Sequence, residues 1–153
     1  MAQTTTAMAF KDAYISWSTA GGSTTFIGND ASGETNSLTL SGFERNHGTA
    51  FTADGDTPVI KAGKRNEGTI SINALYESGV AGFVSKAQTA YEAGSAMYIR
   101  WAPAGATAAN IGYTSSVGIV KNFTYPTGEV GGGEPIAISI DVVCATITQA
   151  ALT

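Results

Sequence analysis

The segment PIAISIDVVCATIT, residues 135–148, decides the fold class that we predict for this chain. Apolar residues alternate along it with other residues, and this period of two is typical of a β-strand with one buried face. The alternating residues are Ile136, Ile138, Ile140, Val142 and Cys144. At Ile147 the alternation changes phase, which indicates a bulge or bend that carries a strand toward barrel closure or into another sheet.

Five other segments carry strand signals. They are AYISWS (13–18), NSLTLSGF (36–43), GTISINAL (68–75), AMYIRWAP (96–103) and IGYTSSVGIVKNFTYP (111–126). The last of them changes phase at Val120, and Gly42 is a possible bulge in the second. Trp17 and Trp101 share the phase of neighbouring isoleucines, so we predict them in the core. The stretch 125–135 is too long for a two-residue turn and is predicted to form the tip of an extended hairpin.

One segment, SGVAGFVSKAQTAYEAG (78–94), has the period of a helix. Its apolar residues recur on one helix face, and they are Val80, Phe83, Val84, Ala87 and Tyr91. We predict a helix of about fourteen residues that Ser78 caps and Gly94 ends, packed across an open end or face of the sheet. Because the strands can pair antiparallel, the chain is predicted to be mainly β with one helix.

The composition favours a single domain over residues 1–153, with much of its surface covered by neighbours. Only 13% of the residues are charged, about half of the usual share of about 25%. The alternative is a solvent-exposed surface on which Thr, Ser, Gly and Asn take the place of charged residues. The net charge of −4 argues against nucleic-acid binding, which needs a basic patch. No apolar run reaches the roughly 20 residues that span a bilayer.

Two further features bear on the cellular compartment. Cys144 lies in an alternating apolar run, so we interpret it as a small buried hydrophobe, and a single cysteine forms no internal disulfide. The first residues, MAQTTTAMAF, lack the charged and apolar regions of a signal peptide. We therefore expect synthesis and residence in a cytosol.

The segment ERNHGTAFTADGDTPVIKAGKRNE, residues 44–67, is charged, rich in turn residues and without a core pattern. Loops longer than about 12–15 residues are usually functional or disordered. Apolar residues occur at intervals along the segment, where they could contact a partner. Its mixed charges suit a partner with complementary charges. We predict inter-subunit contacts by Arg45, His47, Phe51, Asp54, Asp56, Lys61, Lys64 and Arg65. The alternative is a solvated loop with no role.

The patterns of catalytic and ligand-binding chemistry are missing, so we assign no catalytic, cofactor or metal site. His47 is the only histidine, and no G-x-S-x-G motif supports a catalytic triad. Asp54 and Asp56 flank a glycine as in a turn, without the later ligands of a calcium loop. The glycine-rich stretch 128–135 lacks the Lys-Ser/Thr pair of a phosphate loop. A sugar-binding platform could use Trp17, Tyr98, Trp101, Tyr113 and Tyr125, although the two tryptophans are better placed in a core.

The order of these segments resembles the major tail tube proteins of long-tailed, siphovirus-like bacteriophages. A charged loop leads into GTISINALYES, an amphipathic helix, AMYIRWAPAG, a strand ending in FTYPTGE, and the closing strand PIAISIDVVCATIT. The resemblance covers residues 13–148. It implies an antiparallel β-sandwich or barrel with one flanking helix and a long inter-subunit loop.

The resemblance also implies a function. Members of that family form hexameric rings that stack into a hollow tube, through which DNA passes without specific binding. Here the connector would be 44–67, and the N-terminal arm (1–10) and the C-terminal tail (149–153) would be further contact segments. Tape measure and terminator proteins would be partners, and the virion tail would be assembled in the host cytoplasm. A tail terminator, a capsid decoration protein and a carbohydrate-binding β-sandwich module are the alternatives.

Overall fold

The computed structural model describes residues 9–21 and 26–152, and this part of the chain is mainly antiparallel β-structure with one α-helix. The predicted fold class is therefore confirmed. The elements are a 3-10 turn (Phe10–Asp12), β1 (Tyr14–Ser18), β2 (Thr35–Gly42), β3 (Arg45–Ala50), β4 (Val59–Arg65), β5 (Gly68–Leu75), α1 (Phe83–Ala93), β6 (Ala96–Ala102), β7 (Ile111–Ser115), β8 (Gly118–Phe123), β9 (Ala137–Cys144) and β10 (Ile147–Ala151).

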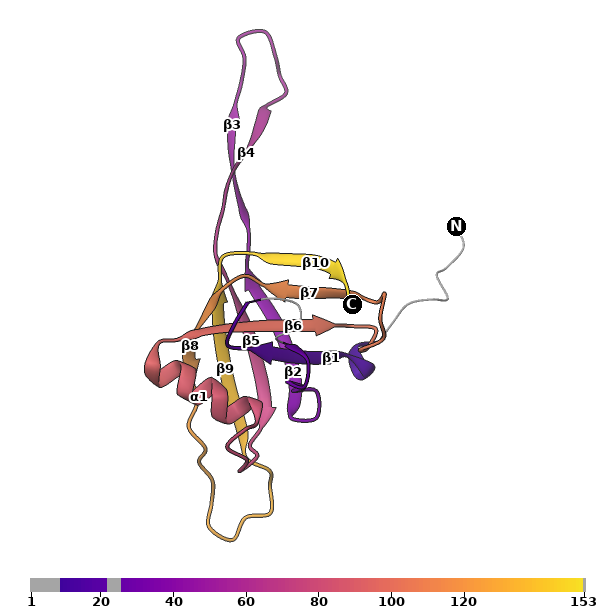
Figure 1. Cartoon of the computed structure of the whole chain (residues 1–153). Helices are drawn as coiled ribbons and strands as arrows, with labels where there is room; N and C mark the ends of the chain where they lie inside the picture. The colour runs from indigo at the N-terminus through magenta and orange to yellow at the C-terminus, as the bar shows by residue number, and fades with distance from the viewer. Residues whose placement is uncertain (1–8, 22–25, 153) are drawn as a thin grey trace.

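The main sheet is curled into a half-barrel. Its strand order is β10-β7-β6-β8-β9-β5-β2, with β1 on the other edge of β6, and all of these pairs are antiparallel. The strand β6 joins the two halves, because Met97 pairs with Gly118 of β8 whereas Trp101 pairs with Tyr113 of β7. In Figure 1 the strands β1, β6, β7 and β10 therefore run crosswise to β5, β8 and β9.

Both segments with a predicted change of phase contain a corner where the chain passes from one half of the sheet to the other, and the change at Ile147 lies at its corner. The segment 111–126 is not one strand, since β7 ends before Ser116 and β8 begins at Gly118. The segment 135–148 divides in the same way between β9 and β10. The two corners are joined, because Ser116 donates its backbone N–H to Thr146 O at 2.8 Å and Thr146 donates its own to Ser116 Oγ at 3.1 Å.

Bulges lie elsewhere than predicted in β2. Gly42 stays in register with Gly68, and the shift in this strand falls between Thr35 and Ser37. A second bulge in β8 falls between Val120 and Asn122, next to the predicted change of phase. The prediction at Gly42 is therefore wrong, although its backbone is unusual, with φ at +77°.

The core lies between the inner face of the curled sheet and α1. Its largest fully buried side chains come from α1, β5, β6 and β9, and they include Phe83, Ile70, Ile72, Met97, Ile99, Ile138 and Ile140. The predictions that Trp17 and Trp101 are core residues are confirmed, and the Trp17 ring lies 6.5 Å from that of Phe83. Cys144 is buried as predicted, and burial raises the pKa of its thiol.

The helix begins later than the sequence predicted. Gly82 rather than Ser78 is its N-cap, and Val80 lies outside the helix with 83% of its surface exposed. Glycine is unfavourable inside a helix, so Gly79 and Gly82 instead form a turn in which the Gly82 N–H bonds to Gly79 O. Gly82 offers no side chain to cap the helix. The Glu34 carboxylate accepts the backbone N–H of Val84 at 3.4 Å and supplies this interaction from another segment.

The predicted helix end is confirmed at Gly94, whose φ of +62° lies in the left-handed region. A Cβ in this conformation meets the following carbonyl, which costs about 1–2 kcal/mol. We therefore expect Gly94→Ala to lower the free energy of unfolding by about 1 kcal/mol in urea denaturation. Gly79→Ala is the control, because its Cβ would meet nothing within 4 Å and its φ is not positive. Equal effects of the two changes would contradict this account of the helix end.

The contact role predicted for the two chain ends stays a prediction. Residues 1–8 of the predicted arm lie outside the described part of the chain. The predicted tail is largely strand, because Gln149–Ala151 belong to β10 and pair with β7. Among the described helices, none has the length and apolar character needed to cross a bilayer.

Candidate functional site

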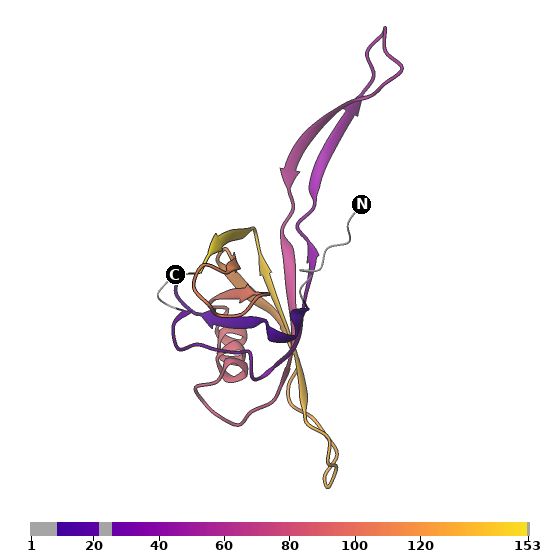
Figure 2. The same ribbon diagram turned by 90° about the vertical axis from the view of Figure 1, so that its right-hand side faces the viewer.

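A hairpin of β3 and β4 projects from the body of the molecule as a continuation of β2 and β5 (Figures 1 and 2). The sequence predicted a connector without secondary structure over 44–67, and this is corrected. Arg45–Ala50 and Val59–Arg65 pair antiparallel, so that only the tip, 51–58, is loop. No alternation marked these strands, because neither face of the hairpin is buried.

Every residue of β3 and β4 is exposed, and in the described part of the chain the two strands pair only with each other. A strand rises about 3.4 Å per residue, so the paired part extends roughly 20 Å from the body. Three large apolar side chains are exposed on the hairpin, and they are Phe51 (69%), Val59 (43%) and Ile60 (64%). An isolated two-stranded hairpin is marginally stable in water. Exposed apolar groups on such a hairpin are typical of a segment that another molecule covers.

The structure brings all eight predicted contact residues into this one hairpin, where each is exposed. Arg45 and His47 lie on β3, Phe51, Asp54 and Asp56 lie in the tip, and Lys61, Lys64 and Arg65 lie on β4. Whether they contact another subunit stays a prediction. Within the described residues, no group of three or more His, Cys, Asp or Glu side chains could hold a metal ion.

The charges of the hairpin are not paired with one another. Among the described residues, the only ion pair joins Lys11 and Asp12. Arg45 lies directly opposite Arg65, and like charges in this arrangement destabilise a strand pair. Arg45 Nη1 donates to the Gly63 carbonyl oxygen at 2.9 Å, which satisfies part of one guanidinium. At the base of the hairpin, therefore, neither guanidinium forms an ion pair with another described residue, although Glu44 and Glu67 lie close to them in the sequence.

The hairpin meets the body through an unusual backbone at Phe43. Its φ of +61° is uncommon for an aromatic residue and follows the φ of +77° at Gly42. The Phe43 ring covers the space that a side chain at Gly68 would need. The chain thus leaves the sheet at a residue with a strained backbone. Such strain persists where surrounding contacts hold the residue in place, and it is common at binding sites.

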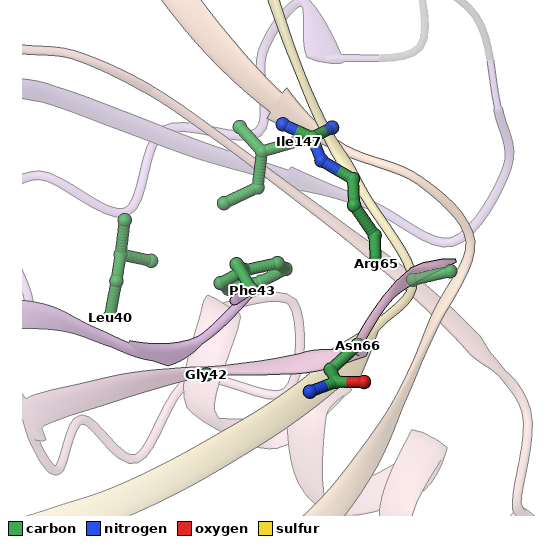
Figure 3. Close-up of a pocket in the computed structure, with 7 residues that line it drawn as sticks. Leu40, Gly42, Phe43, Arg65, Asn66 and Ile147 are labelled. Carbon is green, nitrogen blue, oxygen red and sulfur yellow. The ribbon is translucent and has the colours of Figure 1, made fainter. Parts of the chain in front are cut away.

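A hollow of about 270 Å³ opens beside this joint (Figure 3). Its lining comes from the hairpin base and from the corner between β9 and β10, and consists of Leu40, Gly42, Phe43, Arg65, Asn66, Ala145 and Ile147. The walls are mostly apolar, with one guanidinium, and 48% of the Leu40 surface is exposed. Small-molecule sites usually measure about 300–1,000 Å³, and the volume of this hollow lies just below that range. Sequence reasoning missed it, because its residues come from separate segments.

A second projection, the loop 124–136 between β8 and β9, extends from the opposite end of the molecule (Figures 1 and 2). The predicted hairpin is confirmed, since β8 and β9 pair antiparallel. At its apex the Gly132 N–H bonds to Glu129 O at 3.1 Å, and Gly131 has a φ of +88°. A positive φ at the third residue is typical of a type II turn, which leaves the second residue, Val130, fully exposed.

The outer face of the strands β8, β9, β5 and β2 is rich in hydroxyl and amide groups. Asp141 is a carboxylate on this face, and its oxygens accept hydrogen bonds from Ser71 Oγ at 2.6 Å and Asn122 Nδ2 at 3.3 Å. Nearby, Asn73 Nδ2 donates to Ser37 Oγ at 3.0 Å. These polar groups lie beside two other exposed residues of β8, the apolar Ile119 and the basic Lys121.

Three of the five aromatic residues considered for a sugar platform pack in the body of the fold. Trp17 and Trp101 are 7% and 5% exposed, so neither can offer a ring face to a sugar. Tyr113 instead stacks on Trp101, with ring centroids 5.6 Å apart. The aromatic groups therefore stabilise the body of the fold.

Comparison with known proteins identifies the fold. Neither the protein-family models nor the curated proteins give a match to the sequence. A chain of the sheath-tube complex of the extracellular contractile injection system PVC is 12% identical, with a TM-score of 0.65, over 96% of this chain and 93% of that one. The SPP1 tail tube is 10% identical, with a TM-score of 0.67, over 95% of this chain and 80% of that one.

Proteins that end a tube are similar as well. The tube terminating cap of the anti-feeding prophage is 13% identical, with a TM-score of 0.64, over 99% of this chain and 95% of that one. Such low identities establish a shared fold and nothing finer. This chain has the fold that tail tube and terminator proteins of phage tails and contractile systems share.

Proposed function

We propose that this protein is a structural, non-enzymatic tail tube subunit, which forms hexameric rings that stack into a hollow tube for the passage of DNA. It would be a component of a virion tail of the siphovirus-like kind, assembled in the host cytoplasm with tape measure and terminator proteins. The observation that carries the proposal is the exposed hairpin of β3 and β4 on a fold shared with tail tube proteins.

Self-assembly accounts for features that are unfavourable in a monomer. The hairpin buries no residue of its own, and its charges have no ion-pair partners among the described residues. The sheet is open at β2, where one edge of the strand pairs with no other described strand. Free edges invite pairing with another chain, and monomers usually suppress it. A ring of subunits would join such edges, and a hairpin that reaches a neighbour would join rings.

The outer sheet face suits the lining of a DNA channel. It presents hydroxyl and amide groups, and its carboxylate at Asp141 is already hydrogen-bonded to Ser71 and Asn122. Basic side chains bind the phosphate backbone by releasing its counterions, so a wall with few of them lets DNA move. The net charge of −4 acts in the same direction.

The test is electron microscopy of the purified, concentrated protein in negative stain. We expect tubes or stacked rings with a central channel. A strictly monomeric protein at high concentration, with an NMR-mobile hairpin, would contradict the proposal.

A tail terminator is the second candidate, because the anti-feeding prophage cap matches this chain as well as the tube proteins do. A terminator forms one discrete ring and does not polymerise. The same micrographs separate the two functions, since single rings without stacking would favour the terminator.

A further inference from the structure

We propose that the apex of the loop 124–136 of one copy inserts into the hollow at the hairpin base of a second copy in the adjacent ring. Val130 would enter between the apolar walls, and Glu129 would face the arginines. This inference rests on the proposed function, because it names the contact by which rings would stack.

The positions of the two features favour a contact between copies. The hollow lies where the hairpin leaves the body, and the loop 124–136 extends from the opposite end (Figure 1). The loop therefore cannot fill the hollow of its own chain. A second copy placed end to end along the line that joins the two projections would bring its loop to the hollow. This is a heterologous contact, so it repeats without closing.

Both the hollow and the apex of the loop 124–136 have exposed apolar surface. The hollow has Leu40, Phe43 and Ile147 in its lining, and the exposed fraction of Leu40 is 48%. At the other end Val130 is an isolated apolar residue between a glutamate and three glycines, fully exposed at the corner of a turn. Burying both surfaces together removes apolar area from water, which favours association.

The charges also match. The loop 124–136 contains two acidic residues, Glu129 and Glu134, and no basic one. The hollow contains Arg65, which lies opposite Arg45 in the hairpin. A carboxylate from a second copy would relieve the repulsion between these two guanidinium groups. Complementary charges of this kind fix the register of a contact and exclude wrong partners.

The turn at the apex makes insertion easier. The hydrogen bond from Gly132 N–H to Glu129 O and the positive φ of Gly131 hold Val130 at the outer corner. A side chain already held in its bound position loses less conformational freedom on binding. The hollow, about 270 Å³, has room for the Val130 side chain together with neighbouring parts of the apex.

Disulfide trapping tests the contact directly. Protein with Val130→Cys is mixed with protein carrying Leu40→Cys, oxidised under conditions in which wild-type protein forms tubes, and run on a non-reducing gel. Each chain has one introduced cysteine, and Cys144 is buried, so a cross-linked dimer of this kind joins two copies. The matched control replaces Leu40→Cys with Ile111→Cys, at an apolar residue that is 50% exposed on β7.

We expect at least ten-fold more dimer from the Val130 and Leu40 pair than from the control pair. Disulfides form only where Cβ atoms approach within about 3.5–4.5 Å, so a misplaced contact gives none. Equal yields from the two pairs, in preparations where wild-type protein forms tubes, would overturn the docking and leave the proposed function intact.

Charge reversal gives a second readout that needs no cysteine. We expect Arg65→Glu alone, and Glu129→Arg alone, to raise the protein concentration needed for tube formation about ten-fold or more. The chain with both changes should recover most of the loss, because the pair is restored with its signs exchanged. Normal assembly of both single variants would overturn the docking. If wild-type protein forms no tubes at all, the proposed function fails instead.

Discussion

Replacing Lys61, Lys64 and Arg65 with Ala is expected to leave a folded monomer that no longer forms long tubes. All three residues are exposed on β4, and within the described part of the chain this strand pairs only with β3. Surface substitutions away from a core usually change the free energy of unfolding by no more than about 0.5 kcal/mol each. Every subunit would lose the same three charges from its contacts. A small loss of association free energy per subunit would therefore add up along the tube.

Two measurements check this result together. Circular dichroism with urea denaturation should show an unchanged monomer, and negative-stain micrographs should show monomers or short stacks. The control is Lys11→Ala, Lys86→Ala and Lys121→Ala in one chain, which removes the same charge outside the hairpin. Tubes of normal length from the hairpin variant would refute the connector role of the hairpin.

Replacing Phe83 with Ala is expected to lower the free energy of unfolding by about 3–5 kcal/mol. The side chain is fully buried at the start of α1, next to Trp17, and fills the space between the helix and the sheet. Its removal leaves a cavity that the surrounding strands cannot close, because both neighbouring elements are fixed by their own hydrogen bonds. A domain is usually stable by only about 5–15 kcal/mol, so this loss is large.

Urea denaturation followed by tryptophan fluorescence measures the change, since Trp17 reports on the same region. Val80→Ala is the matched control, because Val80 belonged to the same predicted helix face but is 83% exposed. We expect the control to stay within about 0.5 kcal/mol of wild type. A loss below about 1 kcal/mol for Phe83→Ala would contradict the placement of α1 against the core.

The sequence predicts the parts of the fold in which burial alternates. Ile138, Ile140 and Val142 face one side because β9 is covered on that side alone, and the pattern is legible without a structure. The change of phase at Ile147 is legible for the same reason, since the chain turns a different face inward after the corner, and the change at Val120 lies beside the bulge in β8. Here local pattern and tertiary structure agree.

The start of α1 and the hairpin strands could not be predicted in this way. The apolar spacing included Val80, yet two glycines before Phe83 make a helix there unfavourable, and the backbone turns instead. The hairpin has no buried face, so nothing in its sequence distinguishes strand from loop. Charge and length nevertheless identified Lys61 and Arg65 as contact candidates, because those properties do not depend on secondary structure.

The hollow beside the hairpin left no local signal at all. Leu40, Arg65 and Ile147 are far apart in the sequence, and only the pairing of β2 with β5 and of β5 with β9 brings their segments together. The nearest clue was Gly42, whose left-handed backbone turns the chain at that point. A hollow lined by three separate segments can be predicted only when the pairing register of the strands that join them is known.

The hairpin that buries nothing also has a consequence for the kinetics of polymerisation. In the proposed assembly its strands would gain contacts beyond each other only when a subunit joins others, so the conformational entropy that they keep in the monomer would be lost at that moment. The first few subunits to associate would lose this entropy while forming few contacts. A subunit that joins the end of an existing tube would form all of its contacts at once. Growth should therefore show a lag that preformed seeds abolish, and should yield a few long filaments in preference to many short ones.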